Sequence, residues 1–101
     1  MTRTSWKDLQ SKKLSSMTVE ERREYDQAYA EAHLAAEVGE RIHAAREAAG
    51  LTQRELARRM GTSQAAIDRL ESGGVGATLT TLQRVATALG LEVNVELKPT
   101  A

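Results

Sequence analysis

The sequence predicts an all-α fold, and three features of the chain support that prediction. Two short amphipathic segments, residues 52–60 and 63–71, are separated only by the residues around Gly61. The long run 19–49 contains no proline and a single glycine, and it repeats apolar residues at helical spacing. A further apolar segment, 79–89, follows a glycine-rich connection. A small helical bundle is the expected result.

The ends of these helices are marked by hydroxyl residues that can accept hydrogen bonds from unpaired backbone N–H groups. Thr52 begins the first short helix and has Glu55 three residues later, which is the pattern of a capping box. Ser63 begins the second short helix, and Thr78 precedes the last one. Thr18 with Glu21 predicts that the long helix starts near residue 19. Two short helices joined at a glycine predict a helix-turn-helix.

The second short helix has one apolar face and one polar face. The apolar side chains are expected to face a core, which leaves the others outward. An outward face with an amide, a methyl group, a carboxylate and a guanidinium is suited to reading the edges of DNA bases. The inward residues are Ala66, Ile67 and Leu70, and the outward residues are Gln64, Ala65, Asp68 and Arg69.

From about Glu40 to Leu91, the chain resembles the lambda-repressor-like (Cro/cI, or XRE) helix-turn-helix family. The resemblance is carried by the helix-turn-helix itself and by the segments 46–53 and 79–90. It implies that the second short helix enters the major groove of double-stranded operator DNA. It also implies a structural ion pair between Arg46 and Glu71. Gln53 matches a family position that hydrogen-bonds a DNA phosphate.

Within that docking geometry, the outward residues have different expected partners. Gln64 is expected to read adenine, Arg69 guanine, and Ala65 a thymine methyl group. Asp68 either accepts from a cytosine amine or holds an arginine in place, and the holding role is preferred. Further phosphate contacts are expected from Thr52, Thr62, Ser63 and Arg58. Arg58 and Arg59 are equally well explained as partners of a helix C-terminus.

Residues 91–98 alternate apolar and polar side chains with a period of two, which predicts a half-buried β-strand. No second strand is evident in the sequence, so this strand is expected to pair with the same segment of a second subunit or with a partner protein. Its apolar residues are Leu91, Val93, Val95 and Leu97. This ending is similar to that of HigA-type antitoxins, which pair with ribosome-dependent RNA-cleaving HigB toxins.

The N-terminal part of the chain lies outside the family pattern. Residues 1–17 have little large apolar area, which predicts an arm that is mobile without a partner. The apolar residues of the long run change phase near residues 32–34, so the run is either two helices or one bent helix. The earlier set is Tyr25, Tyr29 and Ala32, and the later set, assigned to the DNA-binding core, is Leu34, Val38, Ile42, Ala45 and Ala49.

These observations predict three regions: an arm and helix (1–35), a DNA-binding domain (36–90), and a C-terminal strand and tail (91–101). The favoured function is a dimeric antitoxin that neutralises a HigB/RelE-like ribonuclease toxin and represses its own operon at a palindromic operator. The alternative is a stand-alone dimeric repressor. The side chains expected to contact a toxin are Trp6, Leu9, Tyr25 and Tyr29.

Composition restricts the other classes of function. Fourteen basic and fourteen acidic residues give no net charge, which disfavours a protein that coats nucleic acid without regard to sequence. There is no cysteine, and His33 and His43 lie ten residues apart, so no metal, cofactor or enzymatic site is expected. Both histidines are interpreted as surface or boundary residues. The absence of an apolar leader or membrane-length run predicts a cytoplasmic protein.

Overall fold

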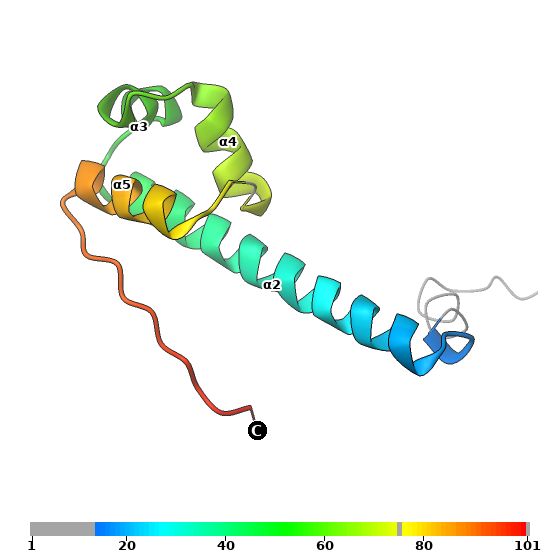
Figure 1. Cartoon of the computed structure of the whole chain (residues 1–101). Coiled ribbons are helices and arrows are strands. Elements are labelled where there is room, and N and C mark those ends of the chain that lie inside the picture. The colour runs from blue at the N-terminus through cyan, green and yellow to red at the C-terminus, as the bar shows by residue number, and fades with distance from the viewer. Residues whose placement is uncertain (1–13, 75, 101) are drawn as a thin grey trace, which may run out of the picture. The chain divides into compact units, whose positions relative to one another are not determined.

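The structure is a computed structural model that describes residues 14–74 and 76–100. It contains α2 (Val19–Ala48), α3 (Gln53–Met60), α4 (Gln64–Gly73) and α5 (Leu79–Leu89) (Figure 1). The all-α part of the predicted fold is therefore confirmed. The backbone divides into two compact units, Met1–Ala32 and His33–Ala101, and α2 contributes to both. Among the described residues, no helix is long and apolar enough to span a bilayer.

The described part of the first unit is held by local contacts along α2. The hydroxyl of Thr18 accepts a hydrogen bond from the backbone N–H of Glu21 at 3.1 Å, so the predicted helix start is confirmed. Exposed i, i+4 pairs follow, including Arg22 with Asp26 at 3.2 Å. Tyr29 is 61% exposed. Trp6 and Leu9, two predicted toxin contacts, lie outside the described residues.

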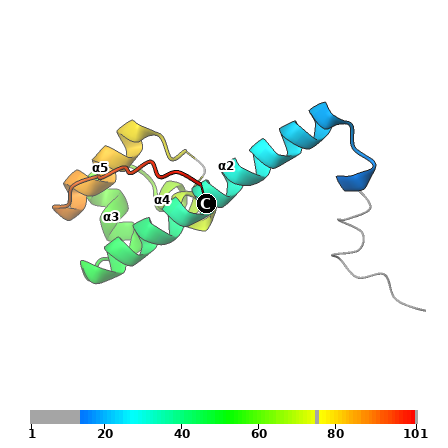
Figure 2. The ribbon, with the colours of Figure 1, turned by 90° about the horizontal axis from the view of Figure 1, so that it is seen from below.

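The second unit is built around a core between the C-terminal half of α2 and the three shorter helices (Figure 2). Leu56 of α3 and Ile67 of α4 are completely buried. The described residues that are buried in this core are aliphatic, apart from one methionine. Its other buried members are Ile42, Ala57, Met60, Leu70 and Val85.

The long run forms one helix, and its buried face differs from the predicted apolar stripe. Ile42 is buried and Val38 half-buried as expected, but Leu34 is 61% exposed and Ala49 is also exposed, so these two core assignments were wrong. The buried face follows the 3.6-residue period through Gly39, Ile42 and Arg46. Two of these three positions carry no apolar side chain, and a search for apolar periodicity therefore misses them.

Two glycines bring the backbones of α2 and α4 into direct contact. A Cβ atom at Gly39 would lie 2.7 Å from the carbonyl oxygens of both Leu70 and Glu71. A Cβ atom at Gly74, whose φ is +68°, would lie 2.5 Å from the carbonyl oxygen of Ala35. In the glycine-rich loop, Gly74 is therefore a position where a side chain would collide with the backbone of α2. These contacts place the C-terminal end of α4 against α2.

Arginine side chains link α3 and α5 in both directions. Arg84 of α5 donates a hydrogen bond to the carbonyl of Met60, the last residue of α3. Arg59 of α3 donates to the carbonyl of Ala88, near the end of α5, at 3.2 Å. The last carbonyls of a helix lack partners within it and attract cations. Arg59 therefore contacts the C-terminal end of α5, whereas its predicted helix partner was the end of its own helix, α3.

Residues 91–100 follow α5 without regular secondary structure in the single chain. The predicted strand required a second chain to supply its hydrogen-bond partners, so its pairing stays a prediction.

Candidate nucleic-acid interface

The start of each helix in the helix-turn-helix is fixed by its N-cap residue. The Thr52 hydroxyl accepts from the N–H of Glu55 at 3.1 Å, and the Glu55 carboxylate accepts from the N–H of Thr52 at 3.2 Å, so the predicted capping box is confirmed. The Ser63 hydroxyl accepts from the N–H of Ala66 at 3.1 Å. Gly61 ends α3 in the left-handed conformation with φ +67°, which only glycine adopts readily.

The helix α4 separates its side chains between core and solvent as the sequence pattern predicted. Ile67 and Leu70 are buried. The guanidinium of Arg69 donates back to the carbonyl of Ala65 at 3.4 Å, a contact within the helix. The four predicted base-reading residues are all exposed: Gln64, Ala65, Asp68 and Arg69.

The predicted phosphate contacts lie at the ends of α3 and in the turn. Thr52 and Ser63 are exposed, and each hydroxyl still has its own proton to donate after capping its helix. Arg58 is exposed in the last turn of α3, whereas Thr62 is half-buried. An open pocket of about 450 Å³ brings together Thr52, Gln53 and Gln64 with Arg46 and Arg54.

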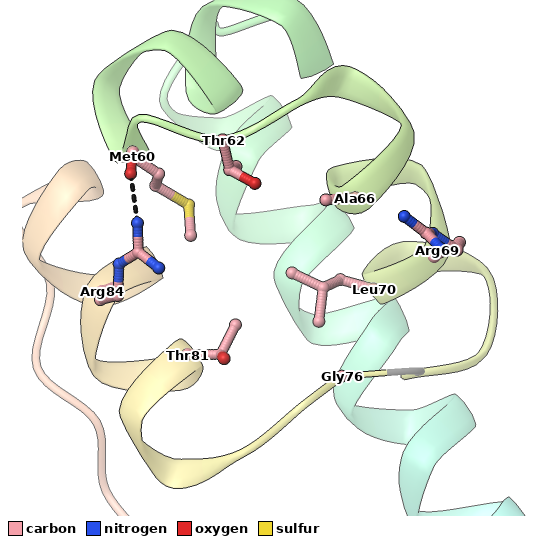
Figure 3. Close-up of a pocket in the computed structure, with 8 residues that line it drawn as sticks. All are labelled: Met60, Thr62, Ala66, Arg69, Leu70, Gly76, Thr81 and Arg84. Atoms are coloured by element: carbon pink, nitrogen blue, oxygen red, sulfur yellow. Dashed lines mark hydrogen bonds between the residues drawn. The ribbon is translucent and has the colours of Figure 1, made fainter.

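A second open pocket, of about 310 Å³, lies between the turn, α4 and α5 (Figure 3). Its lining includes two arginines and two threonines, and no acidic residue of the described part of the chain. It shares Arg69 with the exposed face of α4, so the surface beside that face is positively charged. The lining residues are Met60, Thr62, Ala66, Arg69, Leu70, Gly76, Thr81 and Arg84.

Arg46 and Glu71 form an ion pair that ties α2 to α4. Arg46 Nε lies 2.7 Å from Glu71 Oε2, and Arg46 NH2 lies 2.9 Å from Glu71 Oε1. Burial by itself would raise the pKa of Glu71, but hydrogen bonds from Arg46, His43 and Gln53 hold that pKa below its ordinary value. The hydrogen bond with Glu71 raises the pKa of Arg46. Arg46 also donates to the carbonyl of Leu51 at 2.8 Å, which fixes the entry to α3.

His43 belongs to the same polar network, and the sequence interpretation missed it. Its Nδ1 lies 2.6 Å from Glu71 Oε1, and its Nε2 lies 3.0 Å from Glu47 Oε1. His43 is a surface residue as interpreted, with 48% of its side chain exposed, but its contacts with Glu71 and Glu47 were not predicted. A local signal existed, because His43, Arg46 and Glu47 are spaced at i, i+3 and i+4 on one face of a helix.

Gln53 connects the network to the exposed face of α4. Its side-chain Nε2 donates to Asp68 Oδ1 at 3.3 Å and to Glu71 Oε1 at 3.5 Å. Asp68 therefore holds a glutamine, where an arginine was predicted. With both amide hydrogens directed at carboxylates, a contact between Gln53 and phosphate would use the backbone N–H in the first turn of α3. That contact stays a prediction.

Comparison with known proteins gives the family. A comparison with curated protein sequences finds no significant match. A family model described as helix-turn-helix matches residues 42–95, just over half of the chain, and this range includes α3, α4, α5 and the Arg46–Glu71 pair. This chain belongs to the XRE-like, lambda-repressor-like helix-turn-helix family of DNA-binding transcription regulators.

Proposed function

We propose that this protein represses transcription as a dimer on a palindromic operator, and that it is the antitoxin of a type II toxin–antitoxin pair. The observation that carries the DNA-binding part is the exposed face of α4. Four side chains with base-reading chemistry lie in solvent there, while the opposite face is fixed in the core by Ile67 and Leu70. In the docking geometry of the family, α4 lies in the major groove.

The roles of the base-reading residues follow from their hydrogen-bonding groups. Gln64 presents an amide that can donate to and accept from adenine together, and Arg69 presents a fork that fits guanine. Ala65 fits against a thymine methyl group. The positive lining of the pocket beside α4, with Arg69 and Arg84, favours the approach of the sugar-phosphate backbone.

Dimerisation is proposed through the C-terminal segment. Leu91, Val95 and Leu97 are 52%, 65% and 94% exposed in the single chain, and Val93 is half-buried. A second copy of this segment would cover the apolar side chains and pair the backbone groups as strands. A two-fold axis would then separate the two α4 helices by about one DNA turn, ~34 Å, or a multiple of it.

The antitoxin role is proposed from the chemistry of the first unit. Between Val19 and Ala32, five acidic side chains outnumber two basic ones, and Tyr29 is largely exposed among them. An acidic helix with an exposed aromatic anchor suits a small basic protein, which is the character expected of a HigB/RelE-like ribonuclease toxin. Tyr25 would contribute to the same contact, as would Trp6 and Leu9 from the arm.

The test is co-expression of the full chain with the product of the adjoining open reading frame. We expect a small basic protein that arrests growth alone, co-purifies with this chain and is neutralised by it. Tyr29→Ala should weaken co-purification, whereas Gln27→Ala on the same helix should not. Gln64→Ala combined with Arg69→Ala should abolish promoter binding and leave neutralisation intact. A harmless neighbour that does not co-purify would contradict the antitoxin role and leave a stand-alone repressor.

A further inference from the structure

We infer that Asp68 selects the base at one position of each operator half-site, and that Gln53 is the positioning residue that holds the Asp68 carboxylate for this task. The inference rests on the proposed entry of α4 into the major groove. The base selected is cytosine, and guanine or thymine at that position is rejected.

Because a carboxylate accepts hydrogen bonds, Asp68 favours a base that presents a donor. Ionised Asp68 can only accept hydrogen bonds. In the major groove, cytosine presents an amino donor, whereas guanine and thymine present acceptors. Adenine presents its amino donor next to the N7 acceptor, which would face the same carboxylate. Cytosine is therefore the base whose edge attracts this side chain without a competing repulsion.

The geometry around Gln53 fixes the orientation of its amide. Its Nε2 lies 3.3 Å from Asp68 Oδ1 and 3.5 Å from Glu71 Oε1, so both neighbours are carboxylate oxygens. The reversed amide would direct its own oxygen at two acceptors, which is repulsive. The NH2 group must therefore face Asp68 and Glu71, at distances slightly longer than the usual ~2.7–3.2 Å of N–H···O hydrogen bonds.

Gln53 is itself held by partners that cannot easily move. It is half-buried, and Glu71, one of its two acceptors, is only 4% exposed at the side chain. Two hydrogen bonds from Arg46 fix the Glu71 carboxylate in turn. The chain of contacts from α2 through Glu71 and Gln53 thus ends at Asp68 Oδ1, which leaves Oδ2 to accept from an incoming base. A carboxylate held in this way loses less rotamer freedom when it binds.

The negative charge of Asp68 on the proposed DNA-binding surface also indicates a role in discriminating between bases. A negative charge on the DNA-facing surface repels phosphates and lowers affinity for every sequence. Asp68 is not needed to hold the helices together. Glu71 already links α4 to α2 through Arg46 and to α3 through Gln53. A group that lowers general affinity and rejects two of four bases acts as a repulsive specificity element.

The experiment is selection of binding sites by the full chain from random double-stranded DNA, followed by Kd measurements on single-base variants of the selected site. Wild type should require cytosine at one position per half-site, with a loss of at least about fivefold for guanine or thymine there. Asp68→Asn, whose amide both donates and accepts, should remove that preference and leave the preference read by Gln64 unchanged.

Gln53→Met tests the positioning role, because methionine keeps the length of the side chain and removes the amide. It should reduce the cytosine preference several-fold without changing the preferences at other positions. Gln83→Met, an exposed change on α5, is the matched control and should change neither. If Gln53→Met fails to fold, as judged by its thermal melt, Gln53→Asn replaces it, because its amide is one methylene too short to reach Asp68, and the same loss of cytosine preference is expected.

An unchanged cytosine preference in Asp68→Asn would overturn the inference while leaving the proposed DNA binding in place. An unchanged preference in folded Gln53→Met would overturn the role given to Gln53. If wild type selects no sequence at all, the proposed function fails, and this inference fails with it.

Discussion

Arg46 of α2 and Glu71 of α4 are joined by two hydrogen bonds of 2.7 and 2.9 Å, with only 10% and 4% of their side chains exposed. The same guanidinium reaches the carbonyl of Leu51, just before α3. One side chain therefore connects three parts of the DNA-binding domain. Gly39 adds a direct backbone contact at the same end of α4. The position of α4 depends on this small region.

Replacing Arg46 with methionine should strongly destabilise the domain. The change leaves the buried Glu71 carboxylate without its main partner, and breaking a buried ion pair costs about 3–5 kcal/mol. Arg41→Met is the control, because Arg41 pairs with Glu37 at 3.6 Å on the surface, with side chains 80% and 50% exposed. The loss of stability in Arg41→Met should be below about 0.5 kcal/mol. Urea denaturation measures both, and equal losses would contradict the role of the buried pair.

The pH dependence of stability should show the contribution of Glu71. The pKa of Glu71 in the folded protein is held below its ordinary value. Ionised Glu71 therefore stabilises the fold fully at pH values above the pKa of a glutamate in the unfolded chain, about 4.3. This stabilisation is lost as the pH falls further, through the folded pKa. The stability difference between wild type and Glu71→Gln should therefore be largest near neutral pH and shrink below about pH 4. A difference that grows toward acid would reverse the expected sign.

Adding a methyl group at Gly39 should force α2 and α4 apart. The new Cβ atom would meet two backbone carbonyl oxygens at 2.7 Å, and backbone cannot move aside as a flexible side chain can. The expected cost of Gly39→Ala is about 1–3 kcal/mol, typical of overpacking. Gly73→Ala provides the control, since no atom of the residues that the structure describes lies within 4 Å of the added atom. It should be neutral or slightly stabilising, because alanine favours helix. Thermal melts would distinguish the two, and a neutral Gly39→Ala would argue against the close crossing.

Substitutions of base-reading and phosphate-binding residues should have different effects on the salt dependence of DNA affinity. Gln64→Ala should lower affinity for the operator by about 1–3 kcal/mol and leave the slope of log K against log salt unchanged. Arg58→Ala should reduce that slope by about 0.9, because one phosphate contact is lost. Fluorescence anisotropy titrations over a range of salt concentrations provide both values. An unchanged slope for Arg58→Ala would assign Arg58 to the end of α3 instead of to DNA.

The contact between Arg84 and the end of α3 should stabilise the domain without acting on DNA sequence. Arg84→Leu removes the donor to the Met60 carbonyl, and hydrogen bonds from charged groups contribute about 1.5–3 kcal/mol. The denaturation midpoint should fall while the order of preferred operator variants stays the same. A changed base preference would show that Arg84 also contacts DNA bases.

The sequence by itself was enough for the features that depend on neighbouring residues. Thr52, Ser63 and Thr78 cap their helices as predicted, because an N-cap contact reaches only two or three residues along the chain. The exposed and buried faces of α4 follow from a 3.6-residue period in ten residues. The Arg46–Glu71 contact was expected only because the chain resembles a family that has it.

The tertiary structure alone decided the contacts between segments distant in sequence. Whether Leu34 or Gly39 faces α4, and whether Gln53 meets Asp68, depends on the rotation of the helices and on how closely they cross. Helix rotation and crossing distance are set by the packing of the whole core, and they cannot be predicted from apolar periodicity or residue spacing. His43, which bonds to Glu71 28 positions away, became part of the site only when that packing brought α2 against α4.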